Sequence, residues 1–270
     1  MKIRAIDIGG SAVKTALFEG DARKLKGPYN YEELGRPPHW GSFESWLASR
    51  IDLGVDCVAV SCAGVVDPRH GIVQHCGVAG WTDRPLADNL RALSRRARVV
   101  TLNDAEAHLS AHIGDRPGPL LAAAMGSALG LAISDEQGRI LRTRPSRPLE
   151  LGVLRLATSA ARKQACAALG RPGYDELVAG KGEAKAVEQL GYRLGAFLAE
   201  LTGAFMLRSI VVSGGFAAHH WDRLRPAVER EYRQSLPDFM HGHGATIEAS
   251  RWGRQTALVG IARHASSVLR

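Results

Sequence analysis

Residues 3–20 read IRAIDIGGSAVKTALFEG, two apolar runs separated by an aspartate and a pair of glycines. This pattern predicts two strands, at residues 2–8 and 12–18, joined by a tight turn. Residues 120–138 read LLAAAMGSALGLAISDEQG and repeat the Gly-Ser-Ala step between two apolar runs. We interpret the pair as a duplicated strand-turn-strand unit, with one copy opening each half of the chain.

Composition excludes several classes of protein. The chain has 270 residues and a formal net charge of +8, and most of its cations are arginine. The densest cluster, RALSRRARV at residues 91–99, carries no interleaved aromatic side chain, so we expect a solvated helix face and no nucleic-acid partner. No apolar run reaches the length of a membrane span and no leader pattern follows Met1, which predicts a cytoplasmic protein without a membrane partner. The four cysteines form no CxxC pair, so we expect them to be reduced.

Strand and helix patterns alternate along the chain, which predicts an α/β protein with partly parallel sheets. The stretch DRPGPLL at residues 115–121 combines two prolines with a glycine and is the best candidate for a linker. We therefore expect an N-terminal lobe at residues 1–116 and a C-terminal lobe at residues 117–270. Residues 256–268 form the closing helix, which we expect to pack back on the N-terminal lobe.

The first candidate site is the turn after the first strand, with Asp7, Gly9, Gly10, Ser11 and Lys14. An aspartate at a strand end can hold Mg²⁺ directly or through water, and glycines let backbone N–H groups approach phosphoryl oxygens. Lys14 would add a positive charge. The alternative interpretation is a structural hairpin, because Gly-Gly turns are common.

The second candidate site is TLNDAEAHLSAH at residues 101–112. Asn103 and Asp104 lie at a predicted strand-to-helix junction, where an N-cap explains one polar residue more readily than two. A carboxylate beyond a strand end projects into the crevice where open α/β sheets bind ligands, and it can take a proton from an attacking hydroxyl. The alternative is an Asn103 cap followed by an aspartate that the helix dipole favours.

Two further stretches have weaker signals. Glu150 alternates with leucines in PLELGVLRL, where it is either a ligand-binding carboxylate or part of a solvent face. Ser213, Gly214 and Gly215 follow a buried strand and precede a helix, an arrangement that several folds use for nucleotides.

In this order, the motifs resemble those of the ROK family of sugar kinases, and the resemblance covers nearly the whole chain. The motifs that support the resemblance are DIGGSAVK, GVVDPRHGIV, GWTDRPLADNL, LNDAEA, LELG, VVSGG and TALVGIA. DIGGSAVK together with GSAL and LELG is most similar to the polyphosphate-glucokinase branch, which also lacks the family's cysteine-rich zinc segment. The resemblance implies a two-lobed actin-like ATPase (ribonuclease H-like) fold, with a duplicated βββαβα-type core and a cleft between the lobes.

The resemblance also implies a role for each matching residue. Asp104 would be the general base that deprotonates a sugar hydroxyl, while Asn103, Glu150, Gly64 and Gly77 would lie at substrate-binding positions. Asp7 would position Mg²⁺. The phosphate or nucleotide positions would be Asp7, Gly9, Gly10, Ser11, Lys14, Gly126, Ser127, Gly214 and Gly215. ATP or polyphosphate would be the donor, and the protein would be a homodimer.

The chain departs from the family pattern at the second phosphate motif and on the sugar side. When GSAL is aligned, the family's Gly-Thr-Gly falls on residues 122–124, all alanine, whereas a shifted register places the loop at residues 126–130. Val153 and Gly77 replace a histidine and an asparagine. We therefore expect a modified sugar or cyclitol rather than plain glucose as the substrate. The alternative is a kinase-derived, catalytically impaired protein that binds a sugar or regulates a partner.

Overall fold

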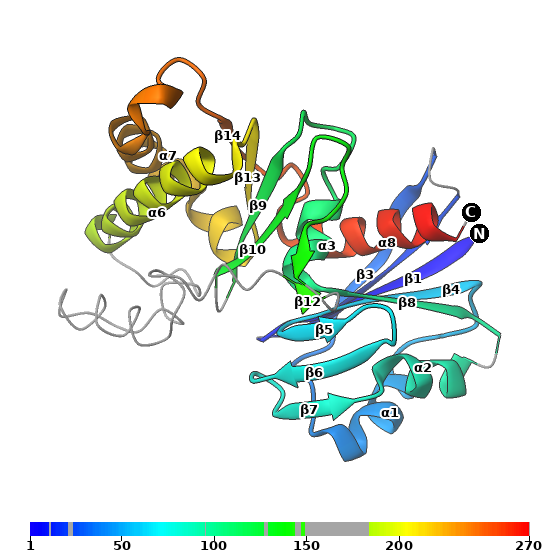
Figure 1. The fold of residues 1–270 in the computed structure, drawn as a ribbon. Coiled ribbons are helices and arrows are strands. Elements are labelled where there is room, and N and C mark those ends of the chain that lie inside the picture. Colours follow the sequence, from blue (N-terminus) through cyan, green and yellow to red (C-terminus); the bar gives the residue numbers. More distant parts are fainter. Residues whose placement is uncertain are drawn as a thin grey trace. The chain divides into compact units, whose positions relative to one another are not determined.

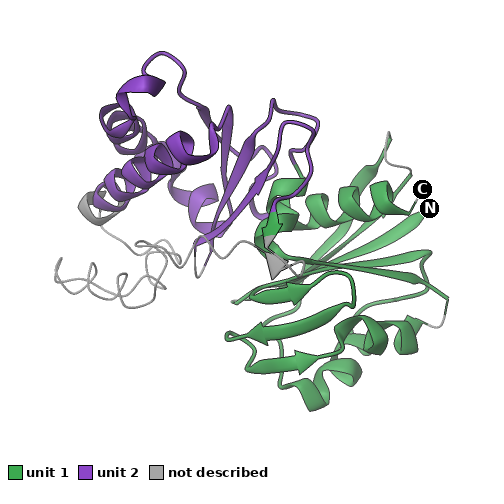
Figure 2. Cartoon of the chain, in the orientation of Figure 1, with its two compact units in different colours: residues 1–111, 142–149, 255–270 green, residues 112–141, 150–254 purple. Residues whose placement is uncertain are grey.

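The computed structural model describes residues 1–10, 12–20, 24–94, 96–126, 129–143, 147–148 and 184–269, and the side chains of residues 143, 147, 148 and 184–187 lie outside that description. The chain forms two compact units (Figure 2). Unit 1 comprises residues 1–111, 142–149 and 255–270, and unit 2 comprises residues 112–141 and 150–254. Each unit has its own sheet and its own apolar core.

Unit 1 is built on a five-stranded sheet in the order β3-β2-β1-β4-β8 (Figure 1). Its elements are β1 (Lys2–Ile8), β2 (Val13–Glu19), β3 (Lys26–Glu33), α1 (Trp40–Ala48), β4 (Cys57–Cys62), β5 (Val65–Asp67), β6 (Ile72–Cys76), β7 (Trp81–Arg84), α2 (Leu86–Ser94), β8 (Arg98–Asn103), α3 (Asp104–Ser110), β11 (Arg142–Thr143), β12 (Arg147–Pro148) and α8 (Thr256–Val268). Strands β1 and β2 are antiparallel, whereas β1, β4 and β8 run parallel. The predicted hairpin at the start of the chain is therefore confirmed.

Pleating divides the side chains of this sheet between two faces. Ile6, Ile8, Val58 and Val60 join the core that also contains residues of α1 and α2. Because successive side chains on a strand alternate, Asp7 projects to the opposite face. Helix α8 contacts β1, β2, β4 and β8 and crosses α3.

Unit 2 contains a four-stranded sheet in the order β10-β9-β13-β14. Its elements are β9 (Leu120–Met125), β10 (Leu129–Ser134), α6 (Ala184–Phe205), β13 (Ser209–Ser213), α7 (Gly215–Ser235), β14 (Thr246–Ala249) and two 3₁₀ turns, Asp238–Met240 and Gly253–Gln255. As in unit 1, an antiparallel hairpin leads the sheet and its first strand has a parallel neighbour on the other side. This repeated topology explains the two Gly-Ser-Ala steps in the sequence, since each follows the first strand of a hairpin.

Gly114 is a C-cap candidate for the helix after Asn103, and sequence patterns also predict a strand at residues 139–144 and a helix at residues 157–169. The first two of these elements are shorter than predicted. The helix after Asn103 ends at Ser110 rather than near Gly114, and Arg263 of α8 donates to the Ala111 carbonyl at 2.7 Å. The strand expected at residues 139–144 is limited to Arg142–Thr143, because Arg139 closes a turn by donating its backbone N–H and its Nε to the Asp135 carboxylate. The helix predicted at residues 157–169 lies outside the described residues.

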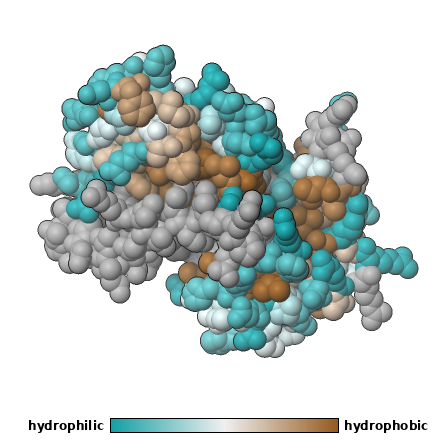
Figure 3. All heavy atoms as spheres, in the orientation of Figure 1, coloured by the Kyte–Doolittle hydropathy of each residue, from teal (hydrophilic) through white to brown (hydrophobic). Residues whose placement is uncertain are grey.

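Large exposed apolar side chains are scattered over the described residues, at Met1, Tyr29, Val78, Met206, Phe239 and Val268. On the face drawn in Figure 3, hydrophilic and hydrophobic residues are interspersed. Among the described residues, no helix combines the length and the apolar character that crossing a bilayer requires.

Candidate functional site

The predicted site residues of unit 1 lie at one edge of its sheet. Strand register pairs Ile8 with Cys62, and Cys62 in turn with Asn103. The carboxyl ends of three parallel strands therefore meet there, and Gly9, Gly64 and Asp104 each follow one of these ends. This is the edge at which open α/β sheets bind ligands.

Asp7 is a buried carboxylate with two polar neighbours on its own sheet. It is 4% exposed. Ser61 of the adjacent parallel strand donates its hydroxyl to Asp7 Oδ1 at 2.8 Å, and Lys14 Nζ lies 3.4 Å from Oδ2 on the antiparallel neighbour. The buried carboxylate thus has a hydrogen-bond donor at one oxygen and a positive charge beside the other, as a buried acidic group requires.

The turn after Asp7 is closed by the backbone. Gly9 donates its N–H to the Ala12 carbonyl at 3.1 Å. A Cβ at Gly9 would lie 3.3 Å from that carbonyl oxygen, so a larger residue would crowd the turn. Gly10 forms the bend beside it. Ser11, predicted for phosphate binding, lies outside the described residues.

His108 approaches Asp7 and Lys14 from helix α3. Burial lowers the pKa of His108 to about 4, against a raising effect of Asp7 and with a further lowering effect of Lys14. The imidazole is therefore neutral at pH 7. Position i+4 from Asp104 places His108 on the same helix face as that aspartate. Sequence reasoning missed both His108 and Ser61, although Ser61 is a polar residue in the otherwise apolar stretch CVAVSCAG.

Asn103 caps helix α3, as its sequence position predicts. Its Oδ1 accepts the backbone N–H of Glu106 at 3.2 Å, while its Nδ2 donates to the Gly64 carbonyl at 2.7 Å. Gly64 has a φ of +96°, and a Cβ there would lie 2.1 Å from the His75 carbonyl oxygen. The site therefore requires glycine at this position. These contacts leave one N–H of the Asn103 amide for a further acceptor.

Asp104 is the first residue of α3 and is half-buried. Its Oδ1 accepts the backbone N–H of Ala105 at 2.9 Å. The helix dipole favours a negative charge in this first turn. Both interpretations of the sequence place the cap at Asn103, and the assignment of Asp104 as a base stays a prediction.

Two cysteine thiols, one at the end of β4 and one at the end of β6, lie next to each other. The Cys62 thiol hydrogen-bonds Cys76, and together with burial and the nearby Asp104 and Asp7 carboxylates this raises the pKa of Cys62 well above its usual range. The same thiol therefore experiences the negative charge of both candidate functional aspartates. Cys57, Cys62 and Cys76 are free thiols, as expected. Gly77 follows Cys76 directly and is exposed.

Unit 2 brings its predicted phosphate residues together in the same way. Ser213 pairs with Ala124 in the parallel register of β13 and β9, so Gly126 and Gly214 follow the aligned ends of neighbouring strands. Gly214 has a φ of +94°, and a Cβ there would lie 2.5 Å from the Met125 carbonyl oxygen. Gly215 begins α7, whose N-terminal N–H groups suit an anion.

The register that places Ala122, Ala123 and Ala124 in the second phosphate loop is wrong. All three lie inside strand β9 and are at most 6% exposed. Strand β9 ends at Met125 and β10 begins at Leu129, so the shifted register at residues 126–130 covers the connection between them and the first two residues of β10. Small residues in β9 suit a buried central strand with neighbours on both sides. Ser127 and Glu150, predicted for phosphate and sugar, lie outside the described residues.

The residues around Asp7 fit a magnesium ion that is shared with phosphate. No group of three or more His, Cys, Asp or Glu side chains within the described part of the chain could hold a metal by itself. Mg²⁺ is commonly bound through one or two carboxylates together with substrate phosphates and water. A buried aspartate with a second carboxylate nearby matches that donor set.

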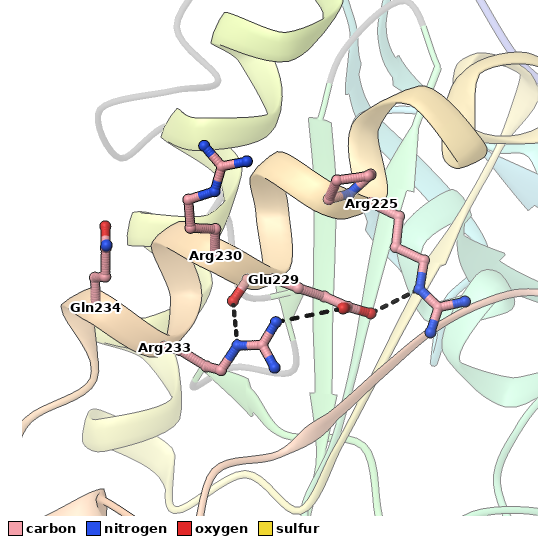
Figure 4. A pocket seen from close by; sticks show the side chains of 6 residues that line it. Arg225, Glu229, Arg230, Arg233 and Gln234 are labelled. Carbon is pink, nitrogen blue, oxygen red and sulfur yellow. Dashed lines mark hydrogen bonds and ion pairs between the residues drawn. The ribbon is translucent and has the colours of Figure 1, made fainter.

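A hollow of about 630 Å³ on α7 lies apart from these residues in the sequence. It is lined by Arg225, Pro226, Glu229, Arg230, Arg233 and Gln234 (Figure 4). Arg225 and Arg233 both form ion pairs with Glu229, while Arg230 donates to the Tyr192 hydroxyl at 2.8 Å. The hollow contains none of the predicted site residues, and internal pairing of its charges indicates a solvated helix face.

Comparison with solved structures identifies the fold. The ROK family glucokinase from Streptomyces griseus, in complex with glucose and AMPPNP, superimposes with a TM-score of 0.78 at 19% identity over 97% of this chain and 98% of that one. The inorganic polyphosphate/ATP-glucomannokinase from Arthrobacter gives 0.65 at 16% identity, over 100% and 99%. A ROK family transcriptional regulator, a homolog of an E. coli protein, gives 0.71 at 18% identity, over 98% of this chain and 78% of that one.

The chain therefore has the fold of the ROK sugar kinases, the actin-like ATPase fold that its sequence predicts. No family model matches the sequence, and no curated protein matches it either.

Proposed function

We propose that the protein is a sugar kinase that transfers a phosphoryl group from ATP or polyphosphate to a hydroxyl of a sugar or sugar-like compound. The observation that carries the proposal is the strand register that gathers Asp7, Ser61, Asn103 and Asp104 at one sheet edge. The fold supports it, because solved neighbours include a glucokinase holding glucose with AMPPNP and a polyphosphate/ATP-glucomannokinase.

In this proposal Asp104 acts as general base. Its carboxylate accepts the proton of the attacking hydroxyl as the new oxygen–phosphorus bond forms and the bond to the donor's bridging oxygen breaks. The Asn103 cap holds the helix start that carries Asp104, and its remaining N–H is available to a neighbouring hydroxyl. Catalysis then depends chiefly on positioning and charge rather than on covalent chemistry by the protein.

Asp7 is the residue that would hold Mg²⁺, directly or through water. The ion would neutralise charge on the transferred phosphoryl group. Lys14 adds a positive charge beside the same carboxylate. Gly9 closes the turn beside this carboxylate through its bond to Ala12. The other proposed phosphate and nucleotide positions are the backbone N–H groups of Gly10, Gly126, Gly214 and Gly215, together with Ser11 and Ser127.

The proposed substrate is a modified sugar or a cyclitol rather than plain glucose. Gly77 provides no side-chain donor or acceptor, and the sequence has Val153 where the resembling family has histidine. A sugar hydroxyl left without a partner in a binding site costs affinity, about 1–3 kcal/mol for each group. Glu150 remains the proposed partner of a sugar hydroxyl, and homodimerisation and a cytoplasmic location remain predictions.

A phosphorylation screen with Asp104→Asn tests the proposal. ATP, GTP and polyphosphate are each combined with sugars and cyclitols, and phosphorylated product is quantified. We expect turnover with at least one pair and a loss of about 100-fold or more in kcat for Asp104→Asn. Asp88→Asn is the matched control, because Asp88 also lies in the first turn of a helix but is exposed. Near wild-type turnover by Asp104→Asn would exclude the general base.

A second candidate function is a kinase-derived regulator that binds a sugar without phosphorylating it. The transcriptional regulator among the structural neighbours favours this alternative. It predicts no product with any donor and acceptor, together with saturable sugar binding in calorimetry.

A further inference from the structure

Glu106 and Arg142 form a two-pronged ion pair within unit 1. Arg142 donates from Nε to Glu106 Oε1 at 2.6 Å and from Nη2 to Oε2 at 3.0 Å. The Glu106 side chain is 2% exposed and that of Arg142 is 25% exposed. Bidentate geometry of this kind fixes the relative orientation of the two side chains as well as their distance.

Glu106 belongs to the same helical turn as the proposed catalytic residues. Its backbone N–H donates to Asn103 Oδ1, and the Asn103 amide donates to the Gly64 carbonyl. Asp104 lies between Asn103 and Glu106 in the sequence. Any displacement of Glu106 therefore moves the cap and the proposed base with it.

Arg142 belongs to the short hairpin β11–β12, which returns to the same place. Strand β12 contacts β5, and β5 begins at Val65, one residue after Gly64. The contacts thus close a ring from Gly64 through Asn103, Glu106, Arg142 and β12 back to Gly64. A hairpin with strands of two residues has little stability of its own, so this ion pair is a main anchor of the ring.

The ion pair is costly to break on one side only. A carboxylate at Glu106 without its guanidinium partner is a buried charge that must recruit water or shift the helix. The charge of Arg142 also acts on His264 of α8, since burial and that charge lower the pKa of His264 to about 4. His264 cannot replace the Glu106 contact, because it carries no negative charge.

We propose that Glu106 and Arg142 are a positioning pair for the sugar side of the site, holding the Asn103 cap and Asp104 at the distance from Gly64 that substrate binding requires. This inference rests on the proposed kinase function and assigns no direct substrate contact to either residue. It gives a reason for the chain to return to unit 1 at Arg142, between the two stretches of sequence that form unit 2.

The test compares Arg142→Gln, Arg142→Lys and Glu106→Gln with Arg139→Gln. Arg139 is the matched control, because it forms an ion pair with Asp135 at 2.7 Å but is 77% exposed in unit 2. Three quantities are measured: kcat/KM for the sugar, KM for the phosphoryl donor, and amide hydrogen exchange of residues 103–110. Thermal unfolding establishes that each variant is folded.

We expect Arg142→Gln and Glu106→Gln to lower kcat/KM for the sugar about tenfold or more, with donor KM nearly unchanged. Exchange at residues 103–110 should accelerate about tenfold, and Arg142→Lys should recover part of both effects. A folded Arg142→Gln with wild-type sugar kinetics, or with wild-type exchange, would overturn the inference. If the wild type neither phosphorylates nor binds any sugar, the proposed function fails instead, and faster exchange in the variants still identifies the structural ring.

Discussion

Ser61 donates its hydroxyl to Asp7 Oδ1 across 2.8 Å between two neighbouring parallel strands. Both side chains are buried, and their residues are in direct register on β4 and β1. The hydroxyl fixes one carboxylate oxygen, which leaves the other facing Lys14 Nζ at 3.4 Å. The orientation of Asp7 is therefore set by a residue 54 positions away in the sequence.

Ser61→Ala removes this hydrogen bond, and we expect it to weaken phosphoryl transfer more than sugar binding. A hydrogen bond to a charged group contributes about 1.5–3 kcal/mol, so the free energy of unfolding should fall by that amount. Donor KM should rise and kcat should fall in steady-state kinetics, while sugar KM stays near the wild-type value.

Ser94→Ala is the control for this substitution, since Ser94 Oγ donates to the Leu90 carbonyl at 2.8 Å on α2. Ser61→Thr restores a hydroxyl and should recover part of the activity. Wild-type donor kinetics in Ser61→Ala would show that Asp7 is oriented by other contacts.

Two histidines predict a loss of stability in mild acid. Burial lowers the pKa of His108 to about 4, and burial with the charge of Arg142 does the same for His264. The unfolded chain, with a histidine pKa near 6.5, binds more protons than the folded chain between pH 6.5 and pH 4. The free energy of unfolding therefore falls as the pH falls through this window, by about 2 kcal/mol for each histidine between pH 8 and pH 5.

Urea unfolding of His108→Gln and His264→Gln at pH 8 and pH 5 measures this effect. Each variant should show a smaller difference between the two pH values than the wild type does. His243→Gln, at an exposed position in unit 2, is the control and should keep the wild-type difference. A wild-type protein equally stable at both pH values would contradict the prediction.

The sequence predicted the repeated hairpins and the Asn103 cap because both depend on residues that are close together in the chain. Alternating apolar residues around a glycine turn determine a hairpin, and an asparagine before a helical pattern determines a cap. The sequence left two registers open for the second phosphate loop, at residues 122–124 and at residues 126–130, because alanine and glycine fit both a loop and a buried strand in a sequence comparison. Only the strand pairing of β9 with β10 and β13 distinguishes the two registers.

Ser61, His108 and Arg142 could not be predicted in the same way. The parallel register of β1 and β4 places Ser61 beside Asp7. The packing of α3 on the same sheet brings His108 near Asp7. Arg142 is one of many arginines in the sequence, and nothing near it in the chain distinguishes it from the exposed Arg139. Its partner Glu106 lies 36 positions away.

Helix α8 lies directly against the backbone of α3 at Gly260. A Cβ at this position would lie 1.7 Å from the Ala107 carbonyl oxygen and 2.8 Å from the backbone nitrogen of Ala111. No flexible side chain can yield there, because both atoms belong to the backbone, one within α3 and the other at its C-cap residue. Helix α3 carries Asp104, so a shift at Gly260 is transmitted to the proposed base (Figure 1).

Gly260→Ala should therefore lower the free energy of unfolding by about 3 kcal/mol or more, although alanine has the higher helix propensity. Gly41→Ala is the matched control, because Gly41 lies in α1 and an added Cβ there would meet nothing within 4 Å. The free energy of unfolding of this variant should be unchanged or higher by up to about 1 kcal/mol. Urea unfolding of both variants gives the comparison, and kcat of folded Gly260→Ala reports the displacement of Asp104. If both variants had the same free energy of unfolding, α8 could move away from α3 with little loss of stability, which would contradict the prediction.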